Sequence, residues 1–262
     1  MTTLADRTIA ALRAVHNQLA ALVPNLTDDQ LTGPSGASEW TIAQVLSHTG
    51  SGAEITLAGY QAALAGEEAP GQEYNESVWA RWDGSTPQEQ AAAVLGHAAA
   101  VVEFLEALSP EQRESLQIKL GFLPFPLSLA AVAGLRLQES TQHLWDVQVA
   151  LDSSAALDAT ASEVLLEHLS GDLGFLIGFI GKADALASSA RVRIGTTDHG
   201  IVVTDSVSIA TPVGDATATF HGPVESVIRL MGGRLRPEFT PAEVHVEGNV
   251  TLDDLRRVFP GY

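Results

Sequence analysis

The chain has 262 residues, which is enough for one large domain or two smaller ones. It contains 14 Lys and Arg residues against 32 Asp and Glu residues, and this formal net charge of −18 argues against a general nucleic-acid binder and against docking on an anionic membrane. Cysteine is absent, so disulfides, cysteine-ligated metals and a cysteine nucleophile are excluded, and any thiol chemistry needs a thiol from outside.

The N-terminal stretch lacks the features of a targeting segment. Asp6 and Arg7 are followed by spaced apolar residues instead of the continuous apolar core of a signal peptide. The longest apolar stretch, Leu173–Ile180, is much shorter than the roughly 20 residues that span a bilayer. We therefore expect a cytoplasmic protein with no membrane partner.

The first 150 residues show apolar residues at helical spacing, interrupted by turn residues. The pattern predicts four long helices, at residues 4–22, about 41–64, 86–108 and about 127–151. Pro24 ends the first helix, and Thr86-Pro87 is typical of a helix start. A polar loop is expected at residues 66–84. Four helices of this length predict a four-helix bundle.

The pattern changes after residue 152. The small, polar segment Asp152–Ala161 is typical of a linker. The remaining elements are a helical region at 162–180, strands at 191–197, 200–204, 207–210, 216–221 and 243–247, and helices at 224–231 and 252–258. The sequence therefore predicts an α+β chain, with a helical bundle at 1–152 and a small α+β domain at 153–262.

Charged residues form a stripe on the last helix of the predicted bundle. Glu139 and His143 are spaced i, i+4, which places both side chains on one face, one turn apart. Arg136 and Asp146 extend this stripe, which would be costly in a dry core unless its members were paired or metal-bound. The alternative is a solvated helix face, and the same helix does carry a second stripe that is apolar.

His48 lies on an otherwise small or apolar stripe of the second predicted helix. A histidine in that setting is commonly a core residue, yet Ser51 and Gly52 in the next turn leave room beside its ring. With Glu139 and His143 it would form a His₂Glu set from two helices. Three ligands and one open position are typical of catalytic zinc, and the donors also suit Ni²⁺ or Fe²⁺.

Two motifs of the first half resemble a known family. Trp40-Thr41 with Val45-Leu46-Ser47-His48, and the pattern Glu139-x-x-x-His143-x-x-Asp146, resemble the DinB-like metal-binding bundles, and among them the mycothiol-dependent maleylpyruvate isomerase family. In the second half the resemblance rests on Leu230-Met231-Gly232-Gly233-Arg234 and Val246-Glu247-Gly248-Asn249. It implies a DinB-like four-helix bundle followed by a small α/β C-terminal domain of the sterol-carrier-protein type.

The resemblance also implies a chemistry. His48, Glu139 and His143 would hold a divalent metal, zinc or else nickel or iron, and mycothiol would be the thiol. The metal would convert the thiol to a nucleophilic thiolate near neutral pH. The thiolate would add to the conjugated double bond of a cis diacid such as maleylpyruvate and leave after rotation, or it would stay attached to an electrophile in an S-transfer reaction. These residues do not separate an isomerase from an S-transferase.

Three further residues are candidates around this site. Asp146 either orients the His143 ring or is a surface carboxylate. Arg136 either forms an exposed salt bridge with Glu139 or contacts an anionic ligand. The resemblance implies a C-terminal arginine for an acidic substrate, and we assign that catalytic role to Arg234, with Arg229 and Arg236 as alternatives.

Two other functions fit the same residues. One is a non-catalytic module that binds a metal or a small ligand, and the other is a metal-dependent hydrolase that uses a metal-bound water. In each case the expected partners are small molecules. A monomer and a homodimer both remain open.

Overall fold

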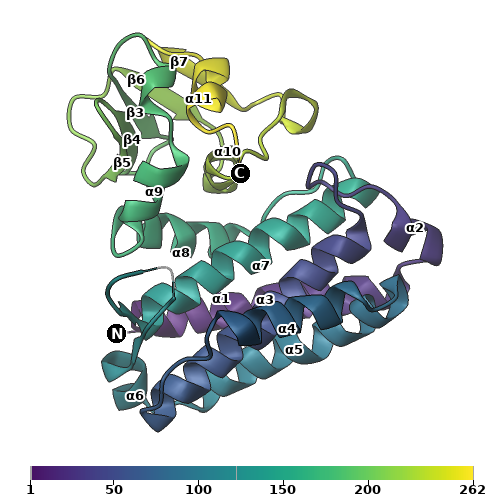
Figure 1. Ribbon diagram of the computed structural model, residues 1–262. Coiled ribbons are helices and arrows are strands. Elements are labelled where there is room, and N and C mark those ends of the chain that lie inside the picture. The colour runs from purple at the N-terminus through teal and green to yellow at the C-terminus, as the bar shows by residue number, and fades with distance from the viewer. Residues whose placement is uncertain (1, 122, 262) are drawn as a thin grey trace. The chain divides into compact units, whose positions relative to one another are not determined.

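The computed structural model describes residues 2–121 and 123–261, which divide into two compact units (Figure 1). The first unit ends at Asp152 and the second begins at Ser153. Among the described residues, no helix is both long enough and apolar enough to cross a membrane.

The first unit is built around four long helices that lie alongside one another (Figure 1). They are α1 (Leu4–Leu22), α3 (Ile42–Ala65), α5 (Pro87–Ala107) and α7 (Leu129–Leu151). Helices α1 and α3 each pack against both α5 and α7, so the four enclose one core. The expected bundle, and its helix positions to within two residues, are confirmed.

The ends of α3 and α5 follow from short-range hydrogen bonds. The hydroxyl of Thr41 accepts the N–H of Gln44 at 3.2 Å, and the Gln44 side chain accepts the N–H of Thr41 at 2.8 Å, which forms a capping box at the start of α3. Gly66 ends α3 in the left-handed conformation with φ +72°. Helix α5 also begins with a capping box, formed by Thr86 and Glu89, and has Pro87 in its first turn. These caps set where α3 begins and ends and where α5 begins.

Several short elements join the long helices. In the first unit these are η1 (Val23–Asn25), α2 (Asp28–Thr32), α4 (Gln72–Asp83), α6 (Pro110–Ser115) and the paired strands β1 (Gln117–Ile118) and β2 (Leu127–Ser128). The expectation of a polar loop at 66–84 is wrong, because α4 occupies most of that segment.

Helix α4 is held by tertiary contacts that the sequence pattern does not show. Most of its residues are exposed, and its two buried residues are Val78 and Trp82, each only 2% exposed. A Cβ added at Gly50 of α3 would lie 2.1 Å from the Trp82 ring, so the ring rests directly on the α3 backbone. The indole Nε1–H also donates to Glu54 of α3 at 3.0 Å.

The second unit contains a sheet and several helices. Its helices are α8 (Ala159–Ser170), α9 (Gly174–Ile180), α10 (Val224–Met231) and α11 (Leu252–Val258), with 3-10 turns η2 (Ala183–Ala185) and η3 (Pro237–Phe239). Its strands are β3 (Ala190–Ile194), β4 (Gly200–Val203), β5 (Val207–Ala210), β6 (Ala218–His221) and β7 (His245–Gly248). This mixed content confirms the expected α+β class.

Within the described residues the strand order is β5-β4-β3-β6-β7, and β7 forms one edge of the sheet. Strands β3 and β6 are parallel, and the other neighbours are antiparallel. The single helical region expected at 162–180 is divided at Gly171 into α8 and α9. The segment expected as a linker is partly helical, because Asp158 caps α8 through the N–H of Ala161.

Candidate metal centre

The three histidine and glutamate side chains expected to act together do meet in the first unit. His48 comes from α3, whereas Glu139 and His143 come one turn apart from α7. The Nε2 of His48 lies 3.2 Å from Oε2 of Glu139, and the Nε2 of His143 lies 3.5 Å from the same oxygen. The packing of α3 on α7 thus brings together residues that are 91 positions apart in the chain.

These separations fit one metal ion. Bonds of about 2.0–2.2 Å in a tetrahedral zinc site place neighbouring ligand atoms roughly 3.3–3.6 Å apart. The two measured N–O separations, 3.2 and 3.5 Å, are close to that range, and all three donor atoms lie within 4.8 Å of one another. Two imidazoles and one carboxylate are donors that Zn²⁺, Ni²⁺ and Fe²⁺ accept.

Asp146 determines how the His143 ring is oriented. Its Oδ2 lies 2.8 Å from Nδ1 of His143, and the Asp146 side chain is fully buried. A carboxylate at Nδ1 favours a proton on that nitrogen and directs Nε2 toward the other donors. Of the two interpretations of Asp146, the surface carboxylate is therefore wrong. Its contact with the site runs through His143.

One side of the centre is open to solvent. The side chains of His48 and Glu139 are 43% and 38% exposed, whereas that of His143 is 7% exposed. His48 is thus not a core histidine. The charged stripe of α7 is not a solvated face either, because Arg136, His143 and Asp146 are buried. A ligand set with one open side leaves room for a further ligand.

Burial and hydrogen bonding compete in setting the charges of the site. Burial alone would raise the pKa of Glu139, but hydrogen bonds and charge from His143 and His48 bring that pKa well below its ordinary value. Burial alone would lower the pKa of His143, but its contacts with Asp146 and Glu139 raise that pKa above its ordinary value. The site thus favours the charged carboxylate form of Glu139 and the protonated form of the His143 ring.

Trp40 is a site residue whose role sequence reasoning missed. Its ring lies 5.1 Å from the ring of His48 and 6.1 Å from that of His143, measured between centroids. The loop that carries Trp40 is tied to α7, because the N–H of Gly36 donates to the carbonyl of Asp146 at 2.7 Å. A Cβ added at Gly36 would lie 2.9 Å from the α7 backbone. The position of Trp40 immediately before the cap of α3 is the signal that indicates it.

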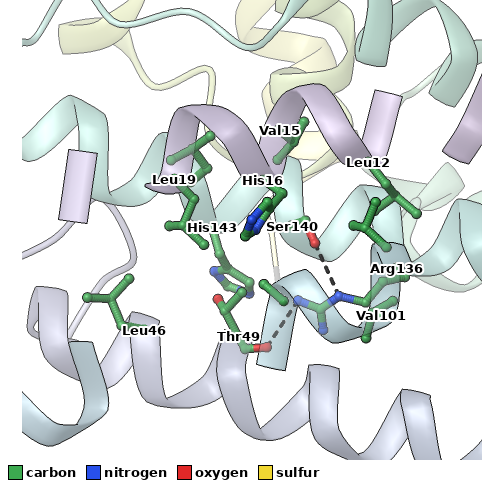
Figure 2. Close-up of a pocket in the computed structure, with 13 residues that line it drawn as sticks. Leu12, Val15, His16, Leu19, Leu46, Thr49, Val101, Arg136, Ser140 and His143 are labelled. Carbon is green, nitrogen blue, oxygen red and sulfur yellow. Dashed lines mark hydrogen bonds between the residues drawn. The ribbon is translucent and has the colours of Figure 1, made fainter. Parts of the chain in front are cut away.

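Arg136 is buried instead of exposed. Its Nε donates to Ser140 Oγ at 3.1 Å, and its Nη2 donates to the carbonyl of Thr49 at 3.0 Å (Figure 2). Within the described residues it makes no ion pair, so the expected surface salt bridge with Glu139 is wrong. A Cβ added at Gly52 would lie 3.0 Å from its Nη1, so the glycine makes space for the guanidinium. Burial lowers the pKa of Arg136.

A small pocket inside the bundle connects Arg136 with the centre. Side chains of α1, α3, α5 and α7 line it, and His16, Thr49, Arg136, Ser140 and His143 are its main polar members (Figure 2). His16 was not considered in the sequence. Its Nδ1 is buried without a hydrogen bond, and burial lowers its pKa. The cavity volume, about 20 Å³, suffices for roughly one water molecule.

The three arginines considered in the second unit differ in their surroundings. Arg229 is 1% exposed and holds Glu225 with two hydrogen bonds of 2.7 and 2.9 Å, so its guanidinium is occupied. Arg236 lies over the ring of Phe239, 4.9 Å from its centroid. Arg234 follows α10, is half-buried, and donates from Nη1 to the carbonyl of Gly232 at 3.0 Å.

Fold and site together define a helical-bundle protein with a candidate divalent-metal centre and a second, α+β unit. The family model described as the mycothiol maleylpyruvate isomerase N-terminal domain matches residues 12–148, which is just over half of the chain. The chain therefore belongs to the mycothiol maleylpyruvate isomerase family.

The chain is also similar to curated relatives and to solved structures. An uncharacterised protein from two strains of Mycobacterium tuberculosis is 30% identical over 161 residues, covering 62% of this chain and 75% of the relative. A crystal structure of the mycothiol-dependent maleylpyruvate isomerase matches with a TM-score of 0.63 at 16% identity, over 95% of this chain and 98% of that one. A histidine-to-alanine mutant of that isomerase matches with a TM-score of 0.64 at 15% identity and the same coverage. At such identities the likeness shows a shared fold.

Proposed function

We propose that the protein is a metal-dependent enzyme that uses mycothiol to catalyse cis–trans isomerisation of a diacid such as maleylpyruvate. The observation that carries the proposal is the His48, Glu139 and His143 cluster, with ligand separations suited to one metal and one open side. Family membership supports the choice of thiol and of reaction. The reaction adds a thiolate to a conjugated double bond and expels it again, so it is redox-neutral and regenerates the thiol.

His48, Glu139 and His143 would hold the metal, which lowers the pKa of a bound thiol and so makes the thiolate available near neutral pH. Asp146 keeps Nδ1 of His143 protonated and the ring in place. Glu139 contributes a negative charge that offsets part of the charge of a divalent ion. The Trp40 ring packs beside the two imidazoles.

Arg136 would supply the cation that a dianionic substrate needs in a protein with a net charge of −18. A buried guanidinium without a carboxylate partner is costly, and an anionic group of a ligand would offset that cost. Its Nη1 makes no hydrogen bond within the described residues and faces the space left by Gly52. The pocket has room for a water molecule, which the end of a carboxylate group would replace.

Arg234 remains our proposal for a second arginine that acts on an anionic substrate. The guanidinium of Arg229 is already held by Glu225, which makes it a weaker candidate. The turn Gly232-Gly233 places Arg234 directly after α10, where Gly233 adopts φ +70°. This role is tested by the substrate comparison given in the Discussion.

The decisive experiment compares two substrates with one enzyme preparation. Zinc-loaded protein is mixed with mycothiol and either maleylpyruvate or a neutral fluorogenic electrophile, with and without a chelator. We expect the cis diacid to be converted to its trans isomer without loss of thiol, and we expect the chelator to stop the conversion. Conjugation of mycothiol to the electrophile, with no isomerisation of the diacid, would indicate that the protein is an S-transferase and not an isomerase.

The remaining functions give different results in the same assay. Metal-dependent hydrolysis that mycothiol inhibits would indicate a metal-bound water as the nucleophile. Zinc binding with no turnover of any substrate would indicate a metal- or ligand-binding module. His143→Ala protein is the matched control, because any activity that survives it does not come from this centre.

A further inference from the structure

The second unit carries a separate pair of histidines on its sheet. His221 ends β6 and His245 begins β7, and the two are direct partners in the antiparallel register. Directly opposite residues on one face have their Cβ atoms about 4.5–5.5 Å apart. The two imidazole rings are stacked, with centroids 4.6 Å apart and planes inclined by 11°.

Glu247 completes a cluster of three. It lies two residues beyond His245 on β7 and therefore points to the same face of the sheet. One of its oxygens lies 3.5 Å from Nε2 of His221, and the other lies 3.5 Å from Nε2 of His245. On the opposite face the neighbouring Phe220 is fully buried, so the register that packs the core also brings the three polar side chains together.

The hydrogen bonds of the cluster leave ligand atoms available. Nδ1 of His245 lies 2.9 Å from the carbonyl oxygen of Glu243, which can only accept, so Nδ1 carries a proton and Nε2 of the neutral ring keeps its lone pair. Nε2 of His221 is shielded from solvent and makes no hydrogen bond with any described residue. Folded proteins commonly pair such a shielded ring nitrogen with an ordered water or an ion.

We propose that His221, His245 and Glu247 form a second metal site, which binds a borderline divalent ion such as Zn²⁺. The three donor atoms lie within 4.8 Å of one another. Each histidine Nε2 lies 3.5 Å from one oxygen of Glu247, and each separation falls within the roughly 3.3–3.6 Å expected between neighbouring ligands of tetrahedral zinc. The two separations involve different oxygens, and one of these would be the carboxylate ligand. The ion would link the edge strand β7 to β6, and its fourth position would be open to water or another small ligand.

The site is tested with zinc alone, in full-length protein that lacks the bundle centre. Protein carrying His48→Ala and His143→Ala is stripped with a chelator, dialysed against Zn²⁺ and analysed for metal per chain. We expect one zinc per chain. Adding His245→Ala should remove it, and adding His221→Ala or Glu247→Gln should weaken it at least tenfold.

Glu243→Gln is the matched control, because it removes the same charge beside the same strand while leaving all three donors in place. It should retain the zinc. Zinc should also raise the melting temperature of the double variant, but not after His245→Ala is added. If the double variant binds no zinc, or keeps it after His245→Ala, the proposal is wrong.

If the double variant does not fold, a second measurement tests the site. Otherwise unaltered protein should then bind two zinc ions per chain, and the single variant His245→Ala should bind one and keep the enzymatic activity. Two ions in both proteins would overturn the site. Because the bundle centre and the sheet site are removed by different variants, failure of one proposal is distinguishable from failure of the other.

Discussion

His143 is the residue on which most contacts of the bundle centre converge. Its Nδ1 faces the buried carboxylate of Asp146 at 2.8 Å, and its Nε2 faces Glu139 at 3.5 Å. Both carboxylates favour the protonated ring and therefore oppose the effect of burial on its pKa. A metal that binds Nε2 must displace a proton that the site holds firmly.

The first prediction concerns the metal ligands. In protein that carries His245→Ala to exclude the sheet site, His48→Ala and His143→Ala should each abolish stoichiometric zinc binding, because two remaining ligands make a poor site. Glu139→Gln should weaken binding. Elemental analysis measures zinc per chain. His97→Ala is the control, since His97 lies beside Glu54 and outside the cluster. Full zinc occupancy in both the His48→Ala and the His143→Ala proteins would refute the assignment.

The second prediction concerns pH. Because the folded pKa of His143 is raised, zinc affinity should fall as the pH falls through that pKa, and zinc uptake should release a proton. Asp146→Asn removes one cause of the raised pKa, so the fall should begin at a lower pH, and affinity at high pH should drop by about 10- to 100-fold. Calorimetric titrations at several pH values, in buffers of different ionisation enthalpy, measure both effects.

The same pKa shift affects the stability of the metal-free protein. A group whose pKa is higher in the folded state stabilises below its unfolded pKa, about 6.5 for histidine, and this stabilisation is lost as the pH rises through the folded pKa. Asp146→Asn should reduce this loss of stability with rising pH. A pH dependence of unfolding identical to that of the parent protein would show that Asp146 does not control His143.

At the scale of elements, the pairing of α3 with α7 creates the centre and the setting of the Arg136 guanidinium, and α1 and α5 complete the pocket around it. Helix α7 carries Arg136, Glu139 and His143 on successive turns. On α3, Gly52 and Thr49 lie against Arg136, and His48 lies against Glu139. The glycine removes a Cβ where the guanidinium lies. One helix pair thus holds a ligand set and a buried cation at neighbouring positions.

The third prediction separates a functional Arg136 from a structural one. Arg136→Met should leave the melting temperature equal or higher, because a buried charge without an ionic partner is replaced by an apolar chain of similar length. Zinc content should be unchanged, and turnover of an anionic substrate should fall by about 10- to 150-fold, as expected for a lost charge-assisted contact of roughly 1.5–3 kcal/mol. Thermal unfolding and kinetics on the same samples test this. A destabilised variant with normal turnover would show that Arg136 is structural.

At the scale of the whole molecule, the chain changes from a bundle to an α+β unit near Asp152. The residues just after that boundary are exposed, whereas Leu157 is buried and its N–H donates to Glu225 at 3.3 Å. Helix α8 then begins at Ala159. The exposed connection is therefore much shorter than the segment 152–161 expected from composition.

The fourth prediction is that, within residues 152–170, limited proteolysis of the full chain cuts close to Asp152 and not beyond Leu157. Exposed backbone outside helices and strands is cut before backbone that is buried or helical. Mass spectrometry of the first fragments locates the cut. The loop at 66–71, which is also exposed, serves as the internal comparison, and a first cut inside α8 would contradict the boundary.

The fifth prediction concerns the second unit's part in the chemistry. Arg234→Ala should preserve zinc content and thiol binding but lower turnover of an anionic substrate by about 10- to 150-fold. Arg234→Lys should restore only part of it, since lysine lacks bidentate geometry. A neutral electrophile should be affected much less. Equal effects on both substrates, or none, would assign Arg234 a structural role.

Local information in the sequence sufficed for several features. Helix limits follow from caps and prolines within one turn, such as Thr41 with Gln44 and Thr86 with Pro87, because these hydrogen bonds join residues three positions apart. The i, i+4 spacing of Glu139 and His143 likewise predicts their shared face before any packing is known. These local patterns, together with the family resemblance of the motifs, predicted the helical bundle, the α+β class and the candidate metal ligands.

Long-range packing decided the rest. The 3.2 Å approach of His48 to Glu139, the burial of Arg136 beside Gly52, and the helix α4 held by Trp82 each depend on which helix faces which. The pairing of His221 with His245 depends on strand register, which is favoured by the burial of the opposite face of the sheet, where Phe220 lies. Such contacts arise from the summed burial of many residues, so no short segment of sequence encodes them.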